Sequence, residues 1–337
     1  MRFAIETHAL TKQYGSKNPA VSSLEIQVED GEIFGLLGPN GAGKTTTVKM
    51  LTTLLRPSSG SATVHGLDVV EDAARVRKVI NYIPQLLTAD DTITGYENLL
   101  FFAKLYGLAR TSREKMIGEA LDLVGLSERA NDIVSSYSGG MKRRLELATV
   151  LVNRPKVLFL DEPTLGLDPR SRIMIWDFLL KMQDDYATTI LVTTNYMDEA
   201  DRLCDNVAIM DLGKIMVRGR PSDLKSSVGG DVVSLVTNAS DAVIEELIKQ
   251  HDYIKAVEYA DGSAKFVLEG RSGKEAAPSI LSDMKDRGCE VASISIQRAS
   301  LDDVFTTYTG KSLEEEVPMG GPIKVVNRAR LLKGMRV

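Results

Sequence analysis

The sequence predicts a layered α/β domain that contains a helical segment and is followed by a small α+β domain. From residue 1 to about 228, short β-branched runs alternate with amphipathic helical patterns, which is typical of an α/β domain. Residues 86–151 are mostly helical in pattern, because apolar residues recur there at helical spacing. We therefore expect domains at residues 1–228 and 229–310 and a tail at residues 311–337.

The elements of the second domain follow from local patterns of the same kind. Asp261-Gly262 lies between two strand-like runs and is a strong hairpin signal. The patterns predict, in chain order, a strand at 231–238, a helix at 240–250, strands at 254–260 and 263–270, a helix at about 274–287 and a strand at 290–297. The order βαββαβ is that of a ferredoxin-like unit.

The tail changes character along its length. It begins acidic at residues 314–316, breaks at Gly320-Gly321-Pro322 and ends basic. A basic end can form a membrane-surface helix, but here the apolar and basic side chains would be spread around the whole circumference. A solvated or partner-docked tail is the favoured interpretation.

Composition limits the class of protein. The chain has 337 residues, a net charge of −5, 43% hydrophobic residues and a pI of about 5.5, which is ordinary for a globular protein and argues against a nucleic-acid partner. Cys204 and Cys289 are far apart and without CxxC spacing, so a reducing compartment fits. Apolar runs fall well short of the roughly 20 residues of a spanning helix, and the first residues lack the apolar core of a signal peptide. We expect a cytoplasmic protein.

A phosphate-binding loop follows the apolar strand pattern at residues 33–37. The segment matches G-x-x-x-x-G-K-[ST], a pattern that arises by chance about once in a hundred chains of this length. Its glycines let backbone N–H groups surround a β-phosphate, Lys44 reaches the β- and γ-oxygens, and the Thr45 hydroxyl can bind Mg²⁺. The predicted nucleotide-binding residues are Gly38, Pro39, Asn40, Gly41, Ala42, Gly43, Lys44, Thr45 and Thr46.

Two carboxylates follow a second apolar run, KVLFLDEP at residues 156–163. Asp161 at the end of such a buried strand can hold the Mg²⁺ hydration shell, and Glu162 can polarise a water toward the γ-phosphate. The alternative is a surface turn with two acids, which the four preceding apolar residues argue against.

A second helix start suited to phosphate lies at residues 138–140. Ser138 is a plausible N-cap, and Gly139 and Gly140 leave N–H groups accessible. Ser-Gly-Gly alone is a common turn sequence, so the position of this motif between the phosphate loop and the Asp-Glu pair carries the interpretation.

The order of these motifs resembles that of the ATP-binding-cassette (ABC) ATPases, which are P-loop NTPases with a helical subdomain, over about residues 1–225. The resemblance implies that Tyr14 stacks on adenine, although an ordinary packed Tyr remains an alternative. It also implies that Gln85 contacts Mg²⁺ and the attacking water, and that Leu167-Asp168 are the D-loop. ATP and Mg²⁺ are the implied cofactors.

The resemblance further implies a homodimer. In the family, the signature serine and glycines of one subunit cover the γ-phosphate held by the other, so two copies enclose two ATPs head to tail. Ser138, Gly139 and Gly140 would act in this way here. Two positions depart from the family pattern, with Met141 replacing the signature Gln and Asn195 replacing the usual His. Asn195 contacts the γ-phosphate or its water, or it caps the helix that begins at Met197.

Within the family, the chain looks most like the daunorubicin-resistance branch of drug and lipid exporters, because of TTNYMDEADRLCD and the C-terminal ASLDDVFTTYTG. Such subunits associate with a permease on another chain, which implies a peripheral position at the inner face of the cell membrane. A permease helix would dock near Gln85 and the helical segment, where aromatic residues form a surface or, as helical spacing favours, a core. These aromatics are Tyr96, Phe101, Phe102 and Tyr106.

Two other classes stay open at this point. A soluble cassette ATPase could act on a macromolecular complex such as a ribosome, but such proteins usually carry two cassettes or zinc modules. A non-hydrolysing binding module is the other class, and intact Lys44, Asp161 and Glu162 argue against it.

Overall fold

The computed structural model describes residues 3–15, 18–228, 231–260, 262–269, 271–310 and 324–327. The chain divides into two compact units, residues 1–215 and 216–337. This division falls earlier in the chain than residue 228, where the sequence pattern changes, and it assigns α8 (Pro221–Val228) to the second unit.

A largely parallel six-stranded sheet forms the centre of the first unit, although its edge strand β11 continues past the division at residue 215. Its order is β11-β10-β4-β9-β8-β7, and the four pairings from β10 through β7 are parallel. Every residue of β4, β8 and β9 is buried, as expected for parallel strands covered on both faces. The strands are β4 (Ile33–Leu37), β7 (Ile80–Ile83), β8 (Val157–Asp161), β9 (Thr189–Thr194), β10 (Asn206–Asp211) and β11 (Lys214–Gly219).

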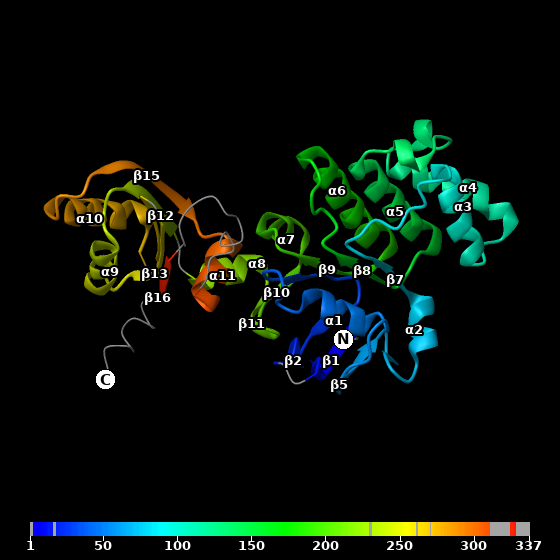
Figure 1. The fold of residues 1–337 in the computed structure, drawn as a ribbon, viewed down its shortest axis with the longest axis horizontal. Helices are drawn as coiled ribbons and strands as arrows, with labels where there is room; N and C mark the ends of the chain where they lie inside the picture. The colour runs from blue at the N-terminus through cyan, green and yellow to red at the C-terminus, as the bar shows by residue number, and fades with distance from the viewer. Residues whose placement is uncertain are drawn as a thin grey trace. The chain divides into compact units, whose positions relative to one another are not determined.

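An antiparallel sheet packs against it from one side, with α1 (Lys44–Leu51) between the two sheets (Figure 1). The main core cluster joins apolar residues of both sheets, including Leu10, Phe34 and Phe159. The elements of this layer are β1 (Phe3–Lys12), β2 (Val21–Leu24), β3 (Gln27–Glu29), β5 (Ser59–Val64), β6 (Leu67–Asp68) and α2 (Ala73–Val79).

Helices complete the first unit. The segment predicted to be helical contains α3 (Gly95–Leu105), α4 (Arg110–Leu123), the 3₁₀ turns η1 (Ser127–Arg129) and η2 (Val134–Ser136), and α5 (Gly139–Asn153). Its three α-helices pack against one another. On the sheet face opposite α1 lie α6 (Pro169–Tyr186) and α7 (Met197–Leu203) (Figure 1).

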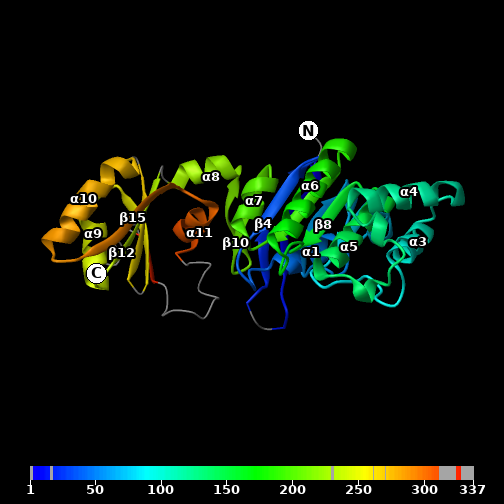
Figure 2. The same ribbon diagram turned by 90° about the horizontal axis from the view of Figure 1, so that it is seen from above.

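The second unit has the predicted βαββαβ order. Its strands pair as β15-β12-β14-β13, all antiparallel, and α9 and α10 lie together on one face of this sheet (Figure 2). The helix α11 (Leu301–Thr309) follows and packs against α8. The elements are β12 (Asp231–Thr237), α9 (Asp241–Gln250), β13 (Ile254–Ala260), β14 (Ser263–Leu268), α10 (Gly273–Asp286) and β15 (Val291–Arg298). The predicted fold class, an α/β domain with a helical segment and a ferredoxin-like unit, is confirmed.

The predicted tail contributes a strand that the sequence analysis overlooked. β16 (Lys324–Asn327) pairs antiparallel with β13, and Val326 packs against the core of the second unit. For these four residues the predictions of a solvated tail and of a membrane-surface helix are both wrong. Their backbone pairs with the open edge of β13, and Val326 adds an apolar side chain to the core. The rest of residues 311–337 lies outside the described residues.

In the part of the chain that the structure describes, no helix combines the length and the apolar character needed to cross a membrane.

Candidate functional site

Four of the five parallel strands of the first unit, β4, β9, β8 and β7, bring separate sequence motifs to one sheet edge. Their pairing sets Leu37 beside Thr194, Asp161 beside Thr193, and Ile83 beside Leu160. The segments that follow these strands therefore leave the sheet at the same carboxyl edge, where ligands bind in open α/β sheets. Those segments carry the phosphate loop, Asn195, Glu162 and Gln85.

The phosphate loop needs glycine at two positions for steric reasons. Gly38 has φ 147° and Gly43 has φ 108°. A Cβ added at Gly38 would lie 2.1 Å from the carbonyl oxygen of Met210, and one added at Gly43 would lie 2.5 Å from that of Ala20. The loop is therefore a tight backbone cradle that an L side chain would fill.

Lys44 is the buried cation of this cradle. Its side chain is 4% exposed, and its Nζ donates to the carbonyl oxygens of Gly38 and, at 3.2 Å, Pro39. The same Nζ lies 3.4 Å from Oε1 of Glu162, which is 8% exposed. The cradle thus holds a charge pair whose lysine can turn toward an anion bound in the loop.

Asp161 accepts two hydroxyl hydrogen bonds on one oxygen. Thr45 Oγ1 donates to Asp161 Oδ1 at 3.0 Å, and Thr193 Oγ1 donates to the same oxygen at 2.6 Å. Thr193 was not predicted from the sequence, although its place at the end of a β-branched strand is a usable signal. The pair Thr45 and Asp161 presents the oxygen ligands that Mg²⁺ prefers.

Glu162 is held in an uncommon backbone conformation. Its φ is 48°, and its N–H donates both to the carbonyl oxygen of Thr193 at 3.0 Å and to Thr193 Oγ1 at 3.1 Å. Gln85 Nε2 donates to Glu162 Oε2 at 3.4 Å. A left-handed residue that is fixed in this way directs its carboxylate, a pattern that is common at functional sites.

These groups surround a cavity of about 290 Å³. Only Ala20 among its lining residues was not singled out from the sequence. The lining residues are Ala20, Pro39, Asn40, Gly41, Ala42, Gly43, Lys44, Thr45, Thr46, Gln85 and Glu162.

The remaining predicted residues of the site do not line this cavity. Tyr14 is 49% exposed rather than packed, with Lys12 Nζ 5.5 Å from its ring centroid. Ser138 is the N-cap of α5 and accepts the N–H of Met141 at 3.2 Å, with Gly139 and Gly140 in the first turn.

Asp168 caps another helix away from the cavity. It is the N-cap of α6 and accepts the N–H of Ser171 at 3.0 Å. Hydrogen bonds from the Ser171 hydroxyl and backbone lower the pKa of Asp168. Ser138 and Asp168 are both exposed, and neither lines the cavity of its own chain.

Asn195 lies at the sheet edge without a capping role. The N-cap of α7 is Tyr196, and no side chain caps that helix. The hydroxyl of Thr194 accepts the N–H of Tyr196 at 2.9 Å and so performs the local turn bond. The helix-cap alternative for Asn195 is therefore wrong. Among the described residues Asn195 Oδ1 is buried and has no hydrogen-bond partner.

A buried carboxylate that the sequence analysis missed connects α6 with α7. Glu199 Oε1 accepts from the Thr164 hydroxyl at 2.8 Å and from Trp176 Nε1 at 2.9 Å. Burial raises the pKa of Glu199. Thr164 follows Glu162 by two residues, so Glu199 fixes the chain just after the site. No local pattern in the sequence distinguishes this Glu from its exposed neighbours.

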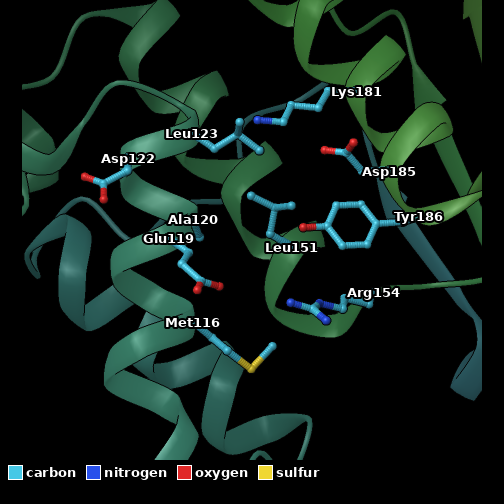
Figure 3. A pocket seen from close by; sticks show the side chains of 10 residues that line it. All are labelled: Met116, Glu119, Ala120, Asp122, Leu123, Leu151, Arg154, Lys181, Asp185 and Tyr186. Carbon is cyan, nitrogen blue, oxygen red and sulfur yellow. The ribbon is translucent and has the colours of Figure 1, made fainter.

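A larger cavity of about 550 Å³ lies elsewhere in the first unit, among α4, α5 and α6 (Figure 3). Arg154 stacks on Tyr186 there, with its guanidinium carbon 5.2 Å from the ring centroid. The lining mixes acidic and basic side chains and includes none of the predicted nucleotide-binding residues. The volume of a cavity alone therefore does not identify the nucleotide-binding site.

No group of three or more His, Cys, Asp or Glu side chains that could enclose a metal ion occurs among the described residues. Thr45 and Asp161 still fit Mg²⁺, because this ion keeps several waters and is bound through one or two carboxylates plus substrate phosphates.

The fold and the site define a nucleotide-binding ATPase of the phosphate-loop class. The family model described as "ABC transporter" matches residues 21–165, and the model "ATP-binding protein DrrA1-3-like, C-terminal domain" matches residues 219–309. The chain belongs to the ABC transporter family, and the resemblance inferred from its motifs is confirmed.

Known relatives extend this result over nearly the whole chain. The chain is 39% identical to the daunorubicin/doxorubicin resistance ATP-binding protein DrrA of Streptomyces peucetius, covering 93% of this chain and 94% of that protein. It is 33% identical to the linearmycin resistance ATP-binding protein LnrL of Bacillus subtilis, covering 92% and 100%. The solved structure of cbiO1 from Clostridium perfringens, part of an ABC transporter complex, superposes with a TM-score of 0.62 at 28% identity over 67% of this chain and 92% of cbiO1.

These relatives assign the activity. The chain is an ATP-binding, ATP-hydrolysing subunit of an ABC exporter, as the motif order predicts. The alternative of an ATPase that acts on a macromolecular complex is not supported.

Proposed function

We propose that the cavity beside the phosphate loop holds the β- and γ-phosphates of ATP and that the residues around it carry out hydrolysis. The observation that carries the proposal is the meeting of buried Lys44 and Glu162 with the amide of Gln85 beside the loop. Loop N–H groups and the positive end of α1 suit an anion, and Lys44 adds a full positive charge.

In the proposed reaction, Glu162 accepts a hydrogen bond from a water that attacks the γ-phosphorus. The bond between that phosphorus and the β-γ bridging oxygen breaks, giving ADP and inorganic phosphate. ATP phosphates offer Lys44 new acceptors, which releases Glu162 from the ion pair seen in the cradle. The amide of Gln85, hydrogen-bonded to Glu162, orients the same water.

Asn195 contacts the γ-phosphate or its water in this proposal. Its Oδ1 is buried and without a hydrogen-bond partner among the described residues, and its chain segment leaves the sheet beside Glu162. An unpaired buried oxygen is costly unless a ligand or water satisfies it. The amide can accept a bond from the water and donate one to a phosphate oxygen.

Thr45, Asp161 and Gln85 would hold Mg²⁺ together with the nucleotide. When bound, this ion neutralises charge on the phosphates. Two hydroxyl hydrogen bonds to Asp161 Oδ1, from Thr45 and Thr193, hold this carboxylate in one orientation. Tyr14, being exposed beside the first strands, is available to stack on adenine.

We further propose that two copies of the chain close head to tail over two ATPs. The support is that Ser138 and Gly139 are exposed at the start of α5 and do not line the cavity of their own chain. The same holds for Asp168 at the start of α6. A second copy would bring these groups to the γ-phosphate.

A separate permease would dock on the helical segment and hold the ATPase at the inner face of the membrane. Phe101 is 58% exposed and Leu86 is 81% exposed, while Tyr96 and Phe102 are only partly buried. The core alternative for these aromatics is therefore weak. Phe102 and Tyr106 also line a cavity of about 110 Å³ beside Thr88. We assign drug-like small molecules as the exported class, because relatives such as DrrA and LnrL are named for resistance to daunorubicin, doxorubicin and linearmycin.

The test of hydrolysis is Glu162→Gln. Turnover should fall by about 10²–10⁴-fold, the range expected for loss of a general base, while ATP affinity stays within a factor of about two. Turnover that survives the substitution would refute the role of Glu162.

The test of the partner is copurification from membranes. Phe101→Lys should release the chain from a multi-spanning membrane protein but leave its basal ATP turnover unchanged, because Phe101 lies outside the cavity. Copurification with ribosomes or DNA would contradict the exporter assignment.

A further inference from the structure

We propose that Arg143 and Glu146 are positioning residues that couple the helix carrying the Ser138 motif to Gln85 and Glu162. The proposal rests on the proposed function of the cavity, because it explains how two groups of that cavity are held. Neither residue lines the cavity itself. Both lie on the first turns of α5 and are buried, at 3% and 4% exposure.

The guanidinium of Arg143 binds backbone on both sides of Glu162. Its Nε donates to the carbonyl oxygen of Pro163 at 2.9 Å, and its Nη2 lies 3.4 Å from the carbonyl oxygen of Asp161. These two carbonyls flank the residue that stands at φ 48°. The guanidinium therefore helps to fix the strained turn that directs the carboxylate.

The same guanidinium binds the segment that carries Gln85. Its Nη1 donates to the carbonyl oxygen of Pro84 at 2.7 Å and to Glu146 Oε2 at 3.0 Å. Glu146 Oε1 accepts from the backbone N–H and, at 2.9 Å, from the hydroxyl of Thr88. The residue before Gln85 and the residue three positions after it are thus both attached to α5.

The geometry gives α5 a direct connection to the site. Ser138 starts this helix, and Arg143 stands less than two turns further along it. A rotation of α5, when its Ser138 end engages a nucleotide, would move the Pro84 and Pro163 carbonyls with it. Only the planar fork of Arg supplies several donors in fixed directions at once, which a Lys ammonium cannot reproduce.

The experiment compares Arg143→Lys with a matched neighbour, Arg144→Ala, in the whole chain. Arg144 is on the same helix but donates to the carbonyl oxygens of Val124 and Gly125, away from the cavity. Arg143→Lys should lower ATP turnover by about 10- to 100-fold, as misplacement of a reacting group does, with ATP affinity within a factor of about two of wild type. Arg144→Ala should leave turnover within a factor of about two.

A second variant separates positioning from folding. The double substitution Arg143→Met with Glu146→Leu replaces a buried ion pair by apolar side chains, which commonly keeps or restores stability. We expect a thermal unfolding midpoint close to that of wild type together with turnover as low as that of Arg143→Lys. Restored stability together with restored turnover would overturn the proposal, because the pair would then serve folding alone.

The remaining outcomes are equally decisive. If Arg143→Lys and Arg144→Ala lose turnover by the same factor, or if ATP affinity falls in step with turnover, the coupling is refuted. If the wild-type chain itself hydrolyses no ATP, the proposed function of the cavity fails instead. Measurements of turnover, affinity for a fluorescent ATP analogue and thermal unfolding on each variant distinguish these cases.

Discussion

The two units of the chain use β-sheets in different ways. In the first unit, parallel strands β4, β9, β8 and β7 all end at one edge, and the segments after them meet around the cavity. In the second unit, neighbouring strands run antiparallel, so the segments after adjacent strands leave at opposite edges. A parallel sheet therefore brings the polar side chains that follow its strands to one edge, whereas an antiparallel sheet distributes them over two edges.

Buried charges show the same contrast. In the first unit Lys44 faces Glu162 beside a cavity. In the second unit Lys265 Nζ lies 2.6 Å from Asp303 Oδ1, while Asp303 also closes the capping box with Ser300 at the start of α11. One pair is placed where a ligand can enter, and the other is used to fix a helix.

The largest expected effect tests whether ATP hydrolysis in the first unit depends on the stability of the second unit. Phe266→Ala, at a fully buried position of β14, should lower the free energy of unfolding of that unit by about 3–5 kcal/mol without changing ATP turnover. Phe159→Ala, equally buried on β8, is the matched change in the first unit and should lower both stability and turnover. Calorimetry and an ATPase assay check this. If the Phe266→Ala variant is folded but loses ATP turnover, the second unit contributes to hydrolysis and the contrast between the two units is wrong.

The next effect concerns the two paired lysines, Lys44 and Lys265. Lys44→Ala removes the cation at the phosphate cradle and should reduce turnover by about 10²–10³-fold, the effect of losing one preorganised donor. Lys265→Met should leave turnover unchanged, because its partner Asp303 is structural. Steady-state phosphate release measures both. Similar losses in the two variants would contradict the division of roles.

A smaller effect is expected at the sheet edge itself. Asn195→Ala should reduce turnover by about 10-fold, which corresponds to one hydrogen bond of about 1.5 kcal/mol, and should leave ADP affinity unchanged because ADP lacks the γ-phosphate. Titration with each nucleotide and an ATPase assay measure these quantities. Equal weakening of ATP and ADP would assign Asn195 to folding.

The smallest effect follows from Glu199. Its pKa is raised above 4.5 by burial, so between pH 4.5 and the raised value the folded state binds more protons than the unfolded state. This group therefore makes stability fall as pH rises through that window and stay level above it. Glu199→Gln can keep both hydrogen bonds to Oε1 and should remove the fall.

Glu199→Gln should therefore raise Tm at neutral pH, by a few degrees at most. Thermal unfolding of both proteins across pH 4–8 tests the sign. A wild-type stability that rises with pH as steeply as the variant's would show that the carboxylate is not penalised by burial.

The sequence predicted the fold and the phosphate cradle because both depend on local patterns. An apolar run before Gly38 and another before Asp161 predict buried parallel strands, and the glycine spacing predicts the tight loop. The hairpin around Gly262 was equally readable, because it needs a positive φ, which Gly262 has at 85°.

The missed features depend on partners far away in the chain. Nothing near Arg143 or Glu146 shows that they are buried, and their partners Pro84 and Pro163 are remote from them. The helix-cap alternative for Asn195 was wrong because the Thr194 hydroxyl already accepts the N–H of Tyr196 in the turn before α7.

The strand β16 has a practical consequence for fragments of this chain. The C-terminal family match ends at residue 309, but residues 324–327 cover the outer side of β13. A recombinant piece cut at residue 309 would expose the backbone N–H and C=O groups of β13 to the solution. Such a bare edge is a template for pairing with another chain, so that piece would self-associate at high concentration, whereas one extended through residue 327 would keep that edge protected.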